Sequence, residues 1–507
     1  MTTIIQLFYD IVIPDSNKTK NIFSIIILVF ISLFFTMYGI EVGEPHVDIY
    51  QLRGVFEKTW YELISDFSTP SGLYGGFQAP IYFLLGKAWG SIFGNDVIQL
   101  RIFSVVAHVL LVVVSWVKFP TISLNKNIFS RFLFSMLISI SPAFIWWAQT
   151  AKYNMWFYSI SAITIITALS FIQRGGISQL VLFSSAIAIM IYTHYFGFII
   201  AAAQYILLSI IGLIKKSKVW FIRLIISIIL TGIFISPILT IVYDAAQKRS
   251  EEGYHFSNQK IKFTAVIRGI ILDWNFGHSL ISDYGNVEKL TLINEHVSKF
   301  RLKSAMALLK GEFALTISAF LCFGLSFAFS ISQILRDREK LLNAAYIISI
   351  PFLCLLLSYL GSLSFRFSYC GVAIWCFLAF YSIGWSNTKH LWLLIANVLF
   401  VVYIFSWSLT NYYQKLEYRY PGFELVNQYL IEEYQNGEKV IIDRWILDHR
   451  DPEKKYLEIP KNVNVSAINK LEEILPILIN DGNAMAFLAG DLDRLTYSIR
   501  DFSKVDN

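Results

Sequence analysis

The chain is organised around the run IFSIIILVFISLFFTMYGI at residues 22–40 and the acidic stretch EVGEPHVD that follows it at residues 41–48. The run holds no charged residue and is long enough to cross the ~30 Å hydrocarbon core of a bilayer as a helix. Glu41, Glu44 and Asp48 therefore lie just beyond one membrane surface. Ionisable groups in that position are costly unless they face water or a protein cavity. Each is a candidate site residue, and a solvated loop is the alternative.

The composition is that of a membrane protein. Hydrophobic residues make up 55% of the 507-residue chain, only 15% of its residues are charged, and the mean hydropathy is +0.55. A soluble domain carries about a quarter charged residues. There is no P-loop and no dinucleotide-binding glycine motif after a strand, so neither nucleotide-sugar nor ATP use is expected. No nucleic-acid partner is expected either. The first apolar run lacks a small-residue cleavage site, so it is expected to remain as a span.

The apolar runs predict a polytopic α-helical membrane protein with about eleven transmembrane helices. Basic residues gather at alternate ends of these runs, which is what the positive-inside rule requires of a cytoplasmic face. The basic clusters are Lys18/Lys20, Lys118/Lys126/Arg131, Arg174, Lys215/Lys216/Lys218/Arg223, Arg336/Arg338/Lys340 and Lys389. The expected spans are 22–40, 101–117, 132–147, 155–172, 178–192, 197–214, 220–241, 313–335, 342–361, 369–386 and 391–409.

The face opposite the basic clusters carries the long segments. The first external loop is large, because residues 79–93 are too few for a span and include Lys87. Together with the amphipathic stretch 54–67, they are interpreted as helices lying in the outer interface. A second long loop runs from about residue 242 to 312, and the last span ends near residue 410.

The C-terminal part has a different composition. Residues 411–507 are richer in charge than the spans, and helical patterns alternate there with short extended runs at 439–443, 462–467 and 484–488. This alternation predicts a small α/β soluble domain. The expected division is therefore a transmembrane domain at 1–410 and an extracytoplasmic domain at 411–507.

Three further segments of the outer face are rich in aromatic and polar residues. They read FQAPIYFLLGKAW (77–89), SPAFIWWAQTAKY (141–153) and YTHYFG (192–197). Together with Asp48, they resemble the GT-C class of polyprenyl-phosphate-sugar-dependent glycosyltransferases. The likeness is to family 39 and its relatives, the protein O-mannosyltransferases and aminoarabinose transferases. That family has an Asp-Glu pair in the first external loop, a His-Pro-Pro-Leu-Tyr-Tyr-like motif, a Ser-Pro-aromatic segment ending in Gln-Glu-Ala-Arg, and a Thr-His-Tyr-Phe turn.

The sequence departs from the family pattern at several positions. Ile49 stands where the family has Glu, Gln78 and Ala79 replace His-Pro, and Thr150 and Lys152 replace the Glu and Arg. A metal site usually needs two or more carboxylates or a histidine. The requirement for a divalent metal is therefore left open. No metal ligands and no other cofactor are assigned.

The resemblance implies transfer of a sugar from a polyprenyl phosphate or diphosphate to a protein, lipid or glycan acceptor on the non-cytoplasmic face. It implies the GT-C architecture, inversion at the anomeric carbon and a place in the bacterial inner membrane. Asp48 would be the base, with Glu44 on the same loop as its alternate. Arg366 and Lys152 would hold the donor phosphate, since a guanidinium pairs with phosphate in a bidentate way.

The candidate substrate-binding residues are Gln78, Gln149, His194 and Tyr195. Other roles stay open: Asp48 as a helix cap, Arg366 extending to headgroups, and Gln149 and His194 within an interfacial aromatic belt. The alternative function is a transporter or polymerase of polysaccharide or lipid-linked glycan. A transporter is expected to show an internal repeat and mid-span charges, and the sequence shows neither clearly.

Overall fold

The structure is a computed structural model that divides into two compact units, each taken by itself below. The first unit contains the described helices and the second contains the described strands. The structure describes residues 18–41, 58–67, 79–124, 128–251, 324–325, 327–360, 366–385, 409, 439–443, 464–468 and 484–487.

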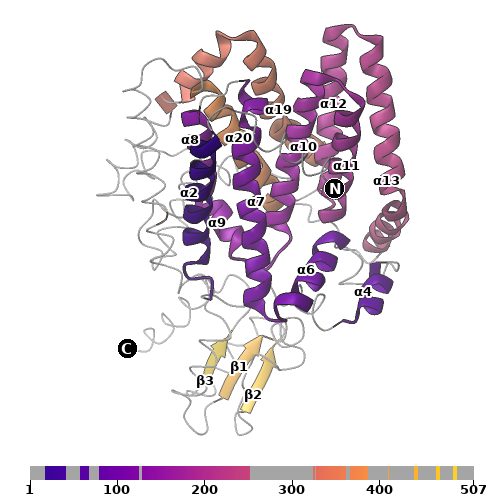
Figure 1. Ribbon diagram of the computed structural model, residues 1–507. Helices are drawn as coiled ribbons and strands as arrows, with labels where there is room; N and C mark the ends of the chain where they lie inside the picture. The colour runs from indigo at the N-terminus through magenta and orange to yellow at the C-terminus, as the bar shows by residue number, and fades with distance from the viewer. Residues whose placement is uncertain are drawn as a thin grey trace, which may run out of the picture. The chain divides into compact units, whose positions relative to one another are not determined.

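Apolar helices make up the first unit, the helical unit (Figure 1). In the described part of the chain, five helices are long and apolar enough to cross a membrane, or up to six if the bent pair α8 and α9 is one span. The chain is therefore a polytopic helical membrane protein. The predicted span 391–409 lies outside the described residues except for its last residue, so the total of eleven stays a prediction. The main helices are α2 (Lys18–Met37), α7 (Val97–Ser123), α8 (Ile128–Ser139), α9 (Pro142–Ala148), α10 (Asn154–Arg174), α11 (Ile177–Thr193), α12 (Gly197–Lys215), α13 (Lys218–Glu251), α19 (Arg338–Leu360) and α20 (Arg366–Trp385).

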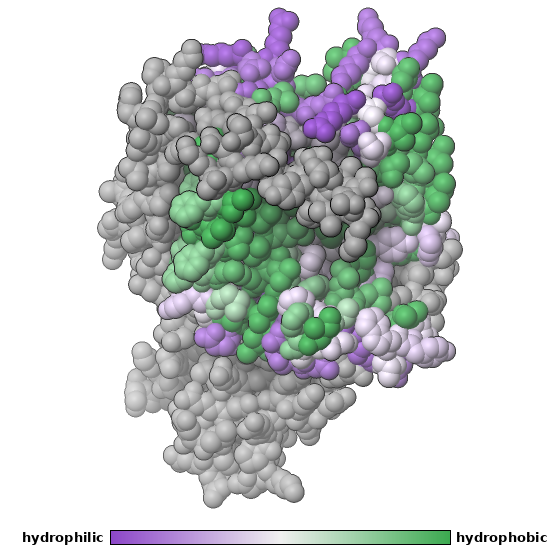
Figure 2. Space-filling model, in the orientation of Figure 1, coloured by the Kyte–Doolittle hydropathy of each residue, from purple (hydrophilic) through white to green (hydrophobic). Residues whose placement is uncertain are grey.

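Successive helices run in opposite directions, so the unit has two ends of different character. At the α6 end, α2 and α9 end, α7 begins and α11 meets α12. At the basic end, α7 ends, α12 meets α13 and α19 begins, and Arg174, Lys215, Lys218 and Arg338 lie there. Figure 2 shows hydrophobic residues forming a band on the visible face, with hydrophilic residues towards the ends of the helical unit.

Polar bonds and close contacts at glycine join the helices. Tyr346 of α19 donates to Gln204 Oε1 of α12 at 3.0 Å, and the Gln204 amide donates to Thr164 Oγ1 of α10 at 2.9 Å. In α20, Gly371 lies directly against the ring of Tyr158, with no room for a Cβ atom. Helices in lipid associate through such contacts, because the hydrophobic effect no longer drives their packing.

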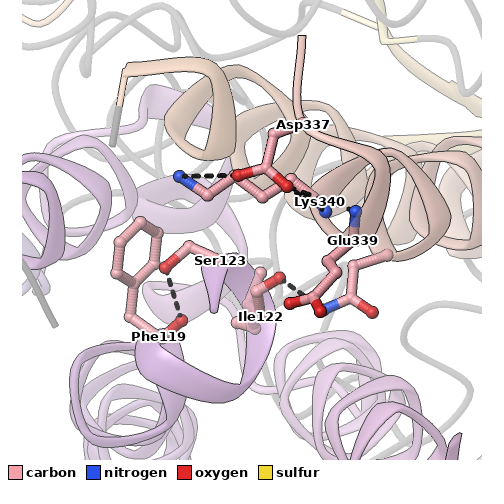
Figure 3. A network of polar contacts seen from close by, with 7 residues as sticks. Phe119, Ile122, Ser123, Asp337, Glu339 and Lys340 are labelled. Atoms are coloured by element: carbon pink, nitrogen blue, oxygen red, sulfur yellow. Dashed lines mark hydrogen bonds and ion pairs between the residues drawn. The ribbon is translucent and has the colours of Figure 1, made fainter. Parts of the chain in front are cut away.

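The basic end has its own polar network, drawn in Figure 3. Asp337 caps α19 by accepting hydrogen bonds from the backbone N–H groups of Glu339 (3.2 Å) and Lys340 (3.3 Å). Further along α19, the Asn343 amide donates to the backbone oxygen of Ile122 at the end of α7, at 3.0 Å. The Asn343 bond joins the first turns of α19 to the last turn of α7.

One predicted span is broken. The sequence analysis treated residues 132–147 as continuous, but α8 and α9 are separate helices bent by 53°. Proline lacks the N–H that would continue the helix and disfavours helical geometry in the residue before it. Ser141 has ψ 118°, which is extended, and Pro142 begins α9. The break therefore follows from Pro142.

The long helix α13 also differs from the prediction. The expected external loop begins near residue 242, whereas α13 continues to Glu251. Pro237 lies inside this helix, so the proline did not end it. The rest of the predicted loop, from residue 252 to 312, lies outside the described residues.

The first external loop contains two helices where the sequence predicts them. They are α4 (Trp60–Phe67) and α6 (Pro80–Phe93). A reciprocal capping box begins α4: the Thr59 N–H donates to Glu62 at 2.7 Å, and the Glu62 N–H donates to the Thr59 hydroxyl at 3.2 Å. The hydrogen bonds from Thr59 lower the pKa of Glu62. α6 packs on α7 and α11 at the α6 end, while its place in the membrane interface stays a prediction.

The second unit contains a three-stranded parallel sheet in the order β2-β1-β3. The strands are β1 (Lys439–Asp443), β2 (Asn464–Ile468) and β3 (Ala484–Phe487), which match the three predicted extended runs. Parallel strands need crossover connections, usually helical. The connecting segments lie outside the described residues, so the α/β domain and its boundary at residue 411 stay predictions.

Candidate active site at the α6 end

The end of α2, just before the acidic stretch, is held by two buried side chains. Arg101, in the first turns of α7, donates from Nη1 to the backbone oxygen of Ile40 at 2.7 Å. The Gln149 amide, at the end of α9, donates to the backbone oxygens of Tyr38 (2.7 Å) and Thr36 (3.2 Å). Arg101 is only 3% exposed and Gln149 only 6%. The last described residues before the acidic stretch are therefore fixed to α7 and α9.

The three aromatic motifs meet at the same end. Tyr82, from the 77–89 motif, lies 6.3 Å from Tyr153 of the 141–153 motif between ring centroids. Tyr153 in turn lies 4.8 Å from His194 of the 192–197 motif. Tyr82 also contacts Phe103 of α7, at 5.8 Å. Segments more than a hundred residues apart in sequence therefore form one aromatic cluster.

His194 is the polar group of this cluster. Its Nδ1 accepts the backbone N–H of Phe196 at 2.9 Å, and its ring packs between Tyr153 and Phe157, the latter at 4.9 Å. Although part of the side chain is exposed, its packing against these rings lowers the pKa of His194, to about 3. Burial likewise raises the pKa of Tyr195 to about 12. Both residues are therefore neutral at pH 7 and can serve as hydrogen-bonding groups.

Lys152 lies in the turn between α9 and α10, next to the cluster. Its backbone N–H donates to Thr150 O at 2.8 Å, and its carbonyl accepts from Ser104 Oγ of α7 at 3.4 Å. The side chain is half-buried. Since Tyr153 follows it directly and contacts His194, the structure brings Lys152, Gln149, His194 and Tyr195 to one end of the helical unit.

The structure does not describe the side chains of the remaining predicted site residues. Asp48, Glu44 and Gln78 lie outside the described residues. Arg366 is the first residue of α20, and since α20 follows α19 at the end opposite the basic end, its backbone also belongs to the α6 end. The Arg366 side chain is not among those described. Whether Asp48, Lys152 and Arg366 share one cavity therefore stays a prediction.

Arg101 is the residue to which the sequence analysis gave no role. A signal for it was present, because Arg101 begins a predicted span at the end opposite the basic clusters, where the positive-inside rule makes basic residues uncommon. The described residues contain no group of three or more His, Cys, Asp or Glu side chains that would hold a metal ion.

No family model matches the sequence, and no curated protein matches it. Among solved structures, the fold is similar to the archaeal oligosaccharyltransferase AglB from Archaeoglobus fulgidus, in complex with an inhibitory peptide and a dolichol-phosphate (12% identity, TM-score 0.46, 88% of this chain and 64% of that chain). It is also similar to ArnT from Cupriavidus metallidurans, in the apo state (11% identity, TM-score 0.41, 92% and 93%) and bound to undecaprenyl phosphate (12%, 0.40, 90% and 88%). This chain spans less than two thirds of the oligosaccharyltransferase. Both neighbours are GT-C membrane glycosyltransferases, the class that the motifs resemble, and at 11 and 12% identity neither assigns a role to a residue of this chain.

Proposed function

We propose that this chain is an integral membrane glycosyltransferase that moves a sugar from a polyprenyl-phosphate or polyprenyl-diphosphate donor to an acceptor. The supporting observation is the meeting of the three aromatic motifs at the α6 end, through the contacts of Tyr153 with Tyr82 and His194. Aromatic and polar groups converging from separate segments are expected of a ligand site. α2 also ends at the α6 end, and the chain continues from there to Asp48.

The reaction is a single displacement. The acceptor oxygen attacks the anomeric carbon, the bond from that carbon to the phosphate oxygen breaks, and the acceptor proton passes to the Asp48 carboxylate, with Glu44 as its alternate. The configuration at the anomeric carbon inverts, because attack comes from the face opposite the leaving group. Arg366 and Lys152 stabilise the charge that develops on the departing polyprenyl phosphate.

The sugar would lie among the aromatic cluster residues. Gln149 is a proposed sugar contact, and its amide nitrogen also donates to the Thr36 and Tyr38 oxygens of α2. His194 would contact the sugar as a neutral side chain, whose Nδ1 accepts the Phe196 N–H. Tyr195 and Gln78 complete the proposed set, and the acceptor is a protein, lipid or glycan.

The α6 end is proposed to face the extracytoplasmic side of a bacterial inner membrane, together with residues 411–507. The basis for this is charge alone: Lys215, Lys218 and Arg223 lie at the opposite end, which the positive-inside rule assigns to the cytoplasm. The transmembrane domain would end near residue 410.

The test is Asp48→Asn in membrane vesicles supplied with polyprenyl-phosphate hexoses labelled in the sugar. Loss of a general base is expected to lower the transfer rate by about 10²–10⁴-fold. Asp96→Asn is the matched control, because Asp96 is another carboxylate near the first loop and caps α7 by accepting the Gln99 N–H at 2.9 Å. Asparagine caps equally well, so this variant should keep its activity.

Two outcomes count against the proposal. Transfer at the wild-type rate in Asp48→Asn would remove Asp48 as the base. A wild-type chain that moves labelled lipid across the bilayer without releasing polyprenyl phosphate would be a transporter instead.

A further inference from the structure

We infer that His108 stabilises the break between α8 and α9, by donating a hydrogen bond to the backbone oxygen whose helical donor is removed by Pro142. His108 is thereby a positioning residue for the 141–153 motif, which begins at this break. The positioning role rests on the proposed function, in which this motif contributes Gln149 and Lys152 to the site. The hydrogen bond itself belongs to the fold, so it can be tested without any measurement of sugar transfer.

The break leaves one backbone oxygen of α8 without its ordinary helical donor. In a continuous helix, the oxygen of Ile138 would accept the N–H of the residue four positions later. That residue is Pro142, which has no N–H. The N–H of Ser141 bonds to this oxygen at 3.3 Å, which is longer than the usual distance of about 2.9–3.0 Å. Ile138 is fully buried, and a poorly bonded polar group is costly in such a place.

His108 supplies a donor to this oxygen from α7. Its Nε2 lies 3.2 Å from the Ile138 oxygen, and its Nδ1 lies 2.9 Å from the hydroxyl oxygen of Ser32 in α2. Both side chains are fully buried, where a charged ring would be costly. A carbonyl oxygen can only accept, so Nε2 of the neutral ring carries the proton and Nδ1 accepts from the Ser32 hydroxyl. The geometry therefore assigns one tautomer to His108.

His108 also contacts the helix on the other side of the break. Its ring centroid lies 6.5 Å from that of Phe144 in α9. One side chain of α7 therefore contacts α2, α8 and α9, which all pack on α7 (Figure 1). Since α9 leads directly to Gln149 and Lys152, the 53° bend at the break determines where these two residues lie. A misplacement of about 1 Å in a reacting site can lower the rate by about 10²-fold.

Trp220 of α13 provides a matched control. Its ring N–H donates to the backbone oxygen of Leu208 at 3.0 Å, so it too joins a buried ring to a neighbouring helix. Leu208, however, lies inside the continuous helix α12, where the N–H four residues later already bonds to its oxygen. Trp220→Phe removes the donor and keeps an aromatic ring against Phe171, whose centroid lies 4.8 Å away. Losing this bond should therefore leave the break and the site unchanged.

Two substitutions at His108 distinguish its two ring nitrogens. His108→Gln can place its amide nitrogen near the position of Nε2, so it keeps a donor for the Ile138 oxygen. His108→Asn is shorter and reaches only the position of Nδ1. It keeps an acceptor for the Ser32 hydroxyl and loses the bond to Ile138. The inference therefore requires His108→Gln to behave as wild type and His108→Asn to fail.

The first measurement follows the exposure of α9 by cysteine labelling in detergent micelles. Ala148, the last residue of α9, is fully buried, so a cysteine from Ala148→Cys should react slowly with a water-soluble maleimide. Adding His108→Asn should raise the labelling rate by about ten- to a hundredfold, the equivalent of leaving a buried acceptor short of its donor. Adding His108→Gln or Trp220→Phe should leave the rate unchanged. Slow labelling in His108→Asn, or fast labelling in His108→Gln, would overturn the inference.

The second measurement determines the tautomer in the wild-type chain. Nitrogen NMR spectra of protein carrying isotope-labelled histidine report which ring nitrogen of each of the eight histidines holds the proton. The signal of His108 is the one that disappears in His108→Gln. We expect the proton on Nε2. A proton on Nδ1 instead, or on both nitrogens, would show that the hydrogen bonds are assigned wrongly.

The third measurement tests the positioning role with labelled polyprenyl-phosphate hexoses. His108→Asn should lower kcat/KM by about 10- to 100-fold, whereas His108→Gln and Trp220→Phe should keep the wild-type value. Equal losses in His108→Asn and His108→Gln would refute the positioning role. If His108→Asn does not accumulate in membranes, accumulation of His108→Gln supports the inference and failure of both variants contradicts it.

These measurements separate the inference from the proposed function. A wild-type chain that transfers no sugar would refute the proposed function. The labelling of Ala148→Cys and the tautomer of His108 would still decide whether His108 stabilises the break.

Discussion

His194 should make the helical unit sensitive to acid. Its Nδ1 accepts the Phe196 N–H at 2.9 Å, and its ring packs against Tyr153 and Phe157. Burial lowers the pKa of His194 to about 3. Protonation of Nδ1 would also turn this acceptor into a donor that faces the Phe196 N–H, which is itself a donor. The folded turn therefore disfavours the imidazolium form.

The size of the effect follows from linkage. An unfolded histidine titrates near pH 6.5, whereas His194 in the folded chain titrates near 3. Between these values the unfolded state binds the proton and the folded state does not. The stability that the neutral form of His194 gives the folded state is therefore fully present above about pH 6.5. It is lost progressively as the pH falls to about 3. At pH 5 the loss is about 2 kcal/mol of unfolding free energy.

The assay compares the wild-type chain with His194→Asn in detergent micelles, by thermal unfolding at pH 7.5 and pH 5.0. The Asn side-chain oxygen can replace Nδ1 as the acceptor of the Phe196 N–H and does not titrate. We expect the wild-type chain to lose about 2 kcal/mol more than the variant between the two pH values, since other groups titrate alike in both. Tyr195→Phe, in the same turn, is the control and should behave as wild type, because the pKa of Tyr195 is near 12.

Equal losses in wild type and His194→Asn would refute this reasoning. They would mean that the imidazole is protonated without penalty, and hence that the packing of its ring against Tyr153 leaves it well hydrated. The same result would refute the role of His194 as a neutral hydrogen-bonding group in the proposed site.

Two further predictions concern helix packing. Gly371→Ala should lower the unfolding free energy by about 1–3 kcal/mol, because the added methyl group would collide with the Tyr158 ring and force α20 away from α10; an unchanged thermal midpoint would contradict this. Tyr346→Phe should cost about 1 kcal/mol, since it removes the donor to the buried Gln204 amide. Adding Gln204→Leu to Tyr346→Phe should cost less than the sum of the two single changes, and full additivity would show that the bond contributes nothing.

The helical architecture was predictable because lipid imposes a simple pattern. A backbone in hydrocarbon must bond to itself, so each long apolar run becomes a helix. The run 22–40 became α2, and the basic residues at its far end and at Arg174 fixed the alternation of the two ends. Helix ends were harder to predict. α13 extends past the last apolar residue to Glu251, since a helix can continue into water where composition no longer marks it.

The gathering of the site motifs was predictable only in outline. The alternation of helix ends placed residues 77–89, 141–153 and 192–197 at one end of the helical unit. It did not show which side chain of a motif meets which neighbour. Gln149 was a candidate for sugar contacts, yet its amide bonds to a backbone oxygen 111 positions earlier in the chain. Such a contact depends on how α2 packs, which no local pattern encodes.

The broken span connects these observations. A straight helix through residues 128–149 would continue along the axis of α8, whereas the 53° bend turns α9 so that it packs on both α2 and α7. Gln149 follows α9 directly, so the bend places its amide at the last oxygens of α2. Pro142 thus does more than interrupt a helix. It directs the aromatic motif that follows it towards the exit of α2, and thereby links the 141–153 motif to the segment that leads to Asp48.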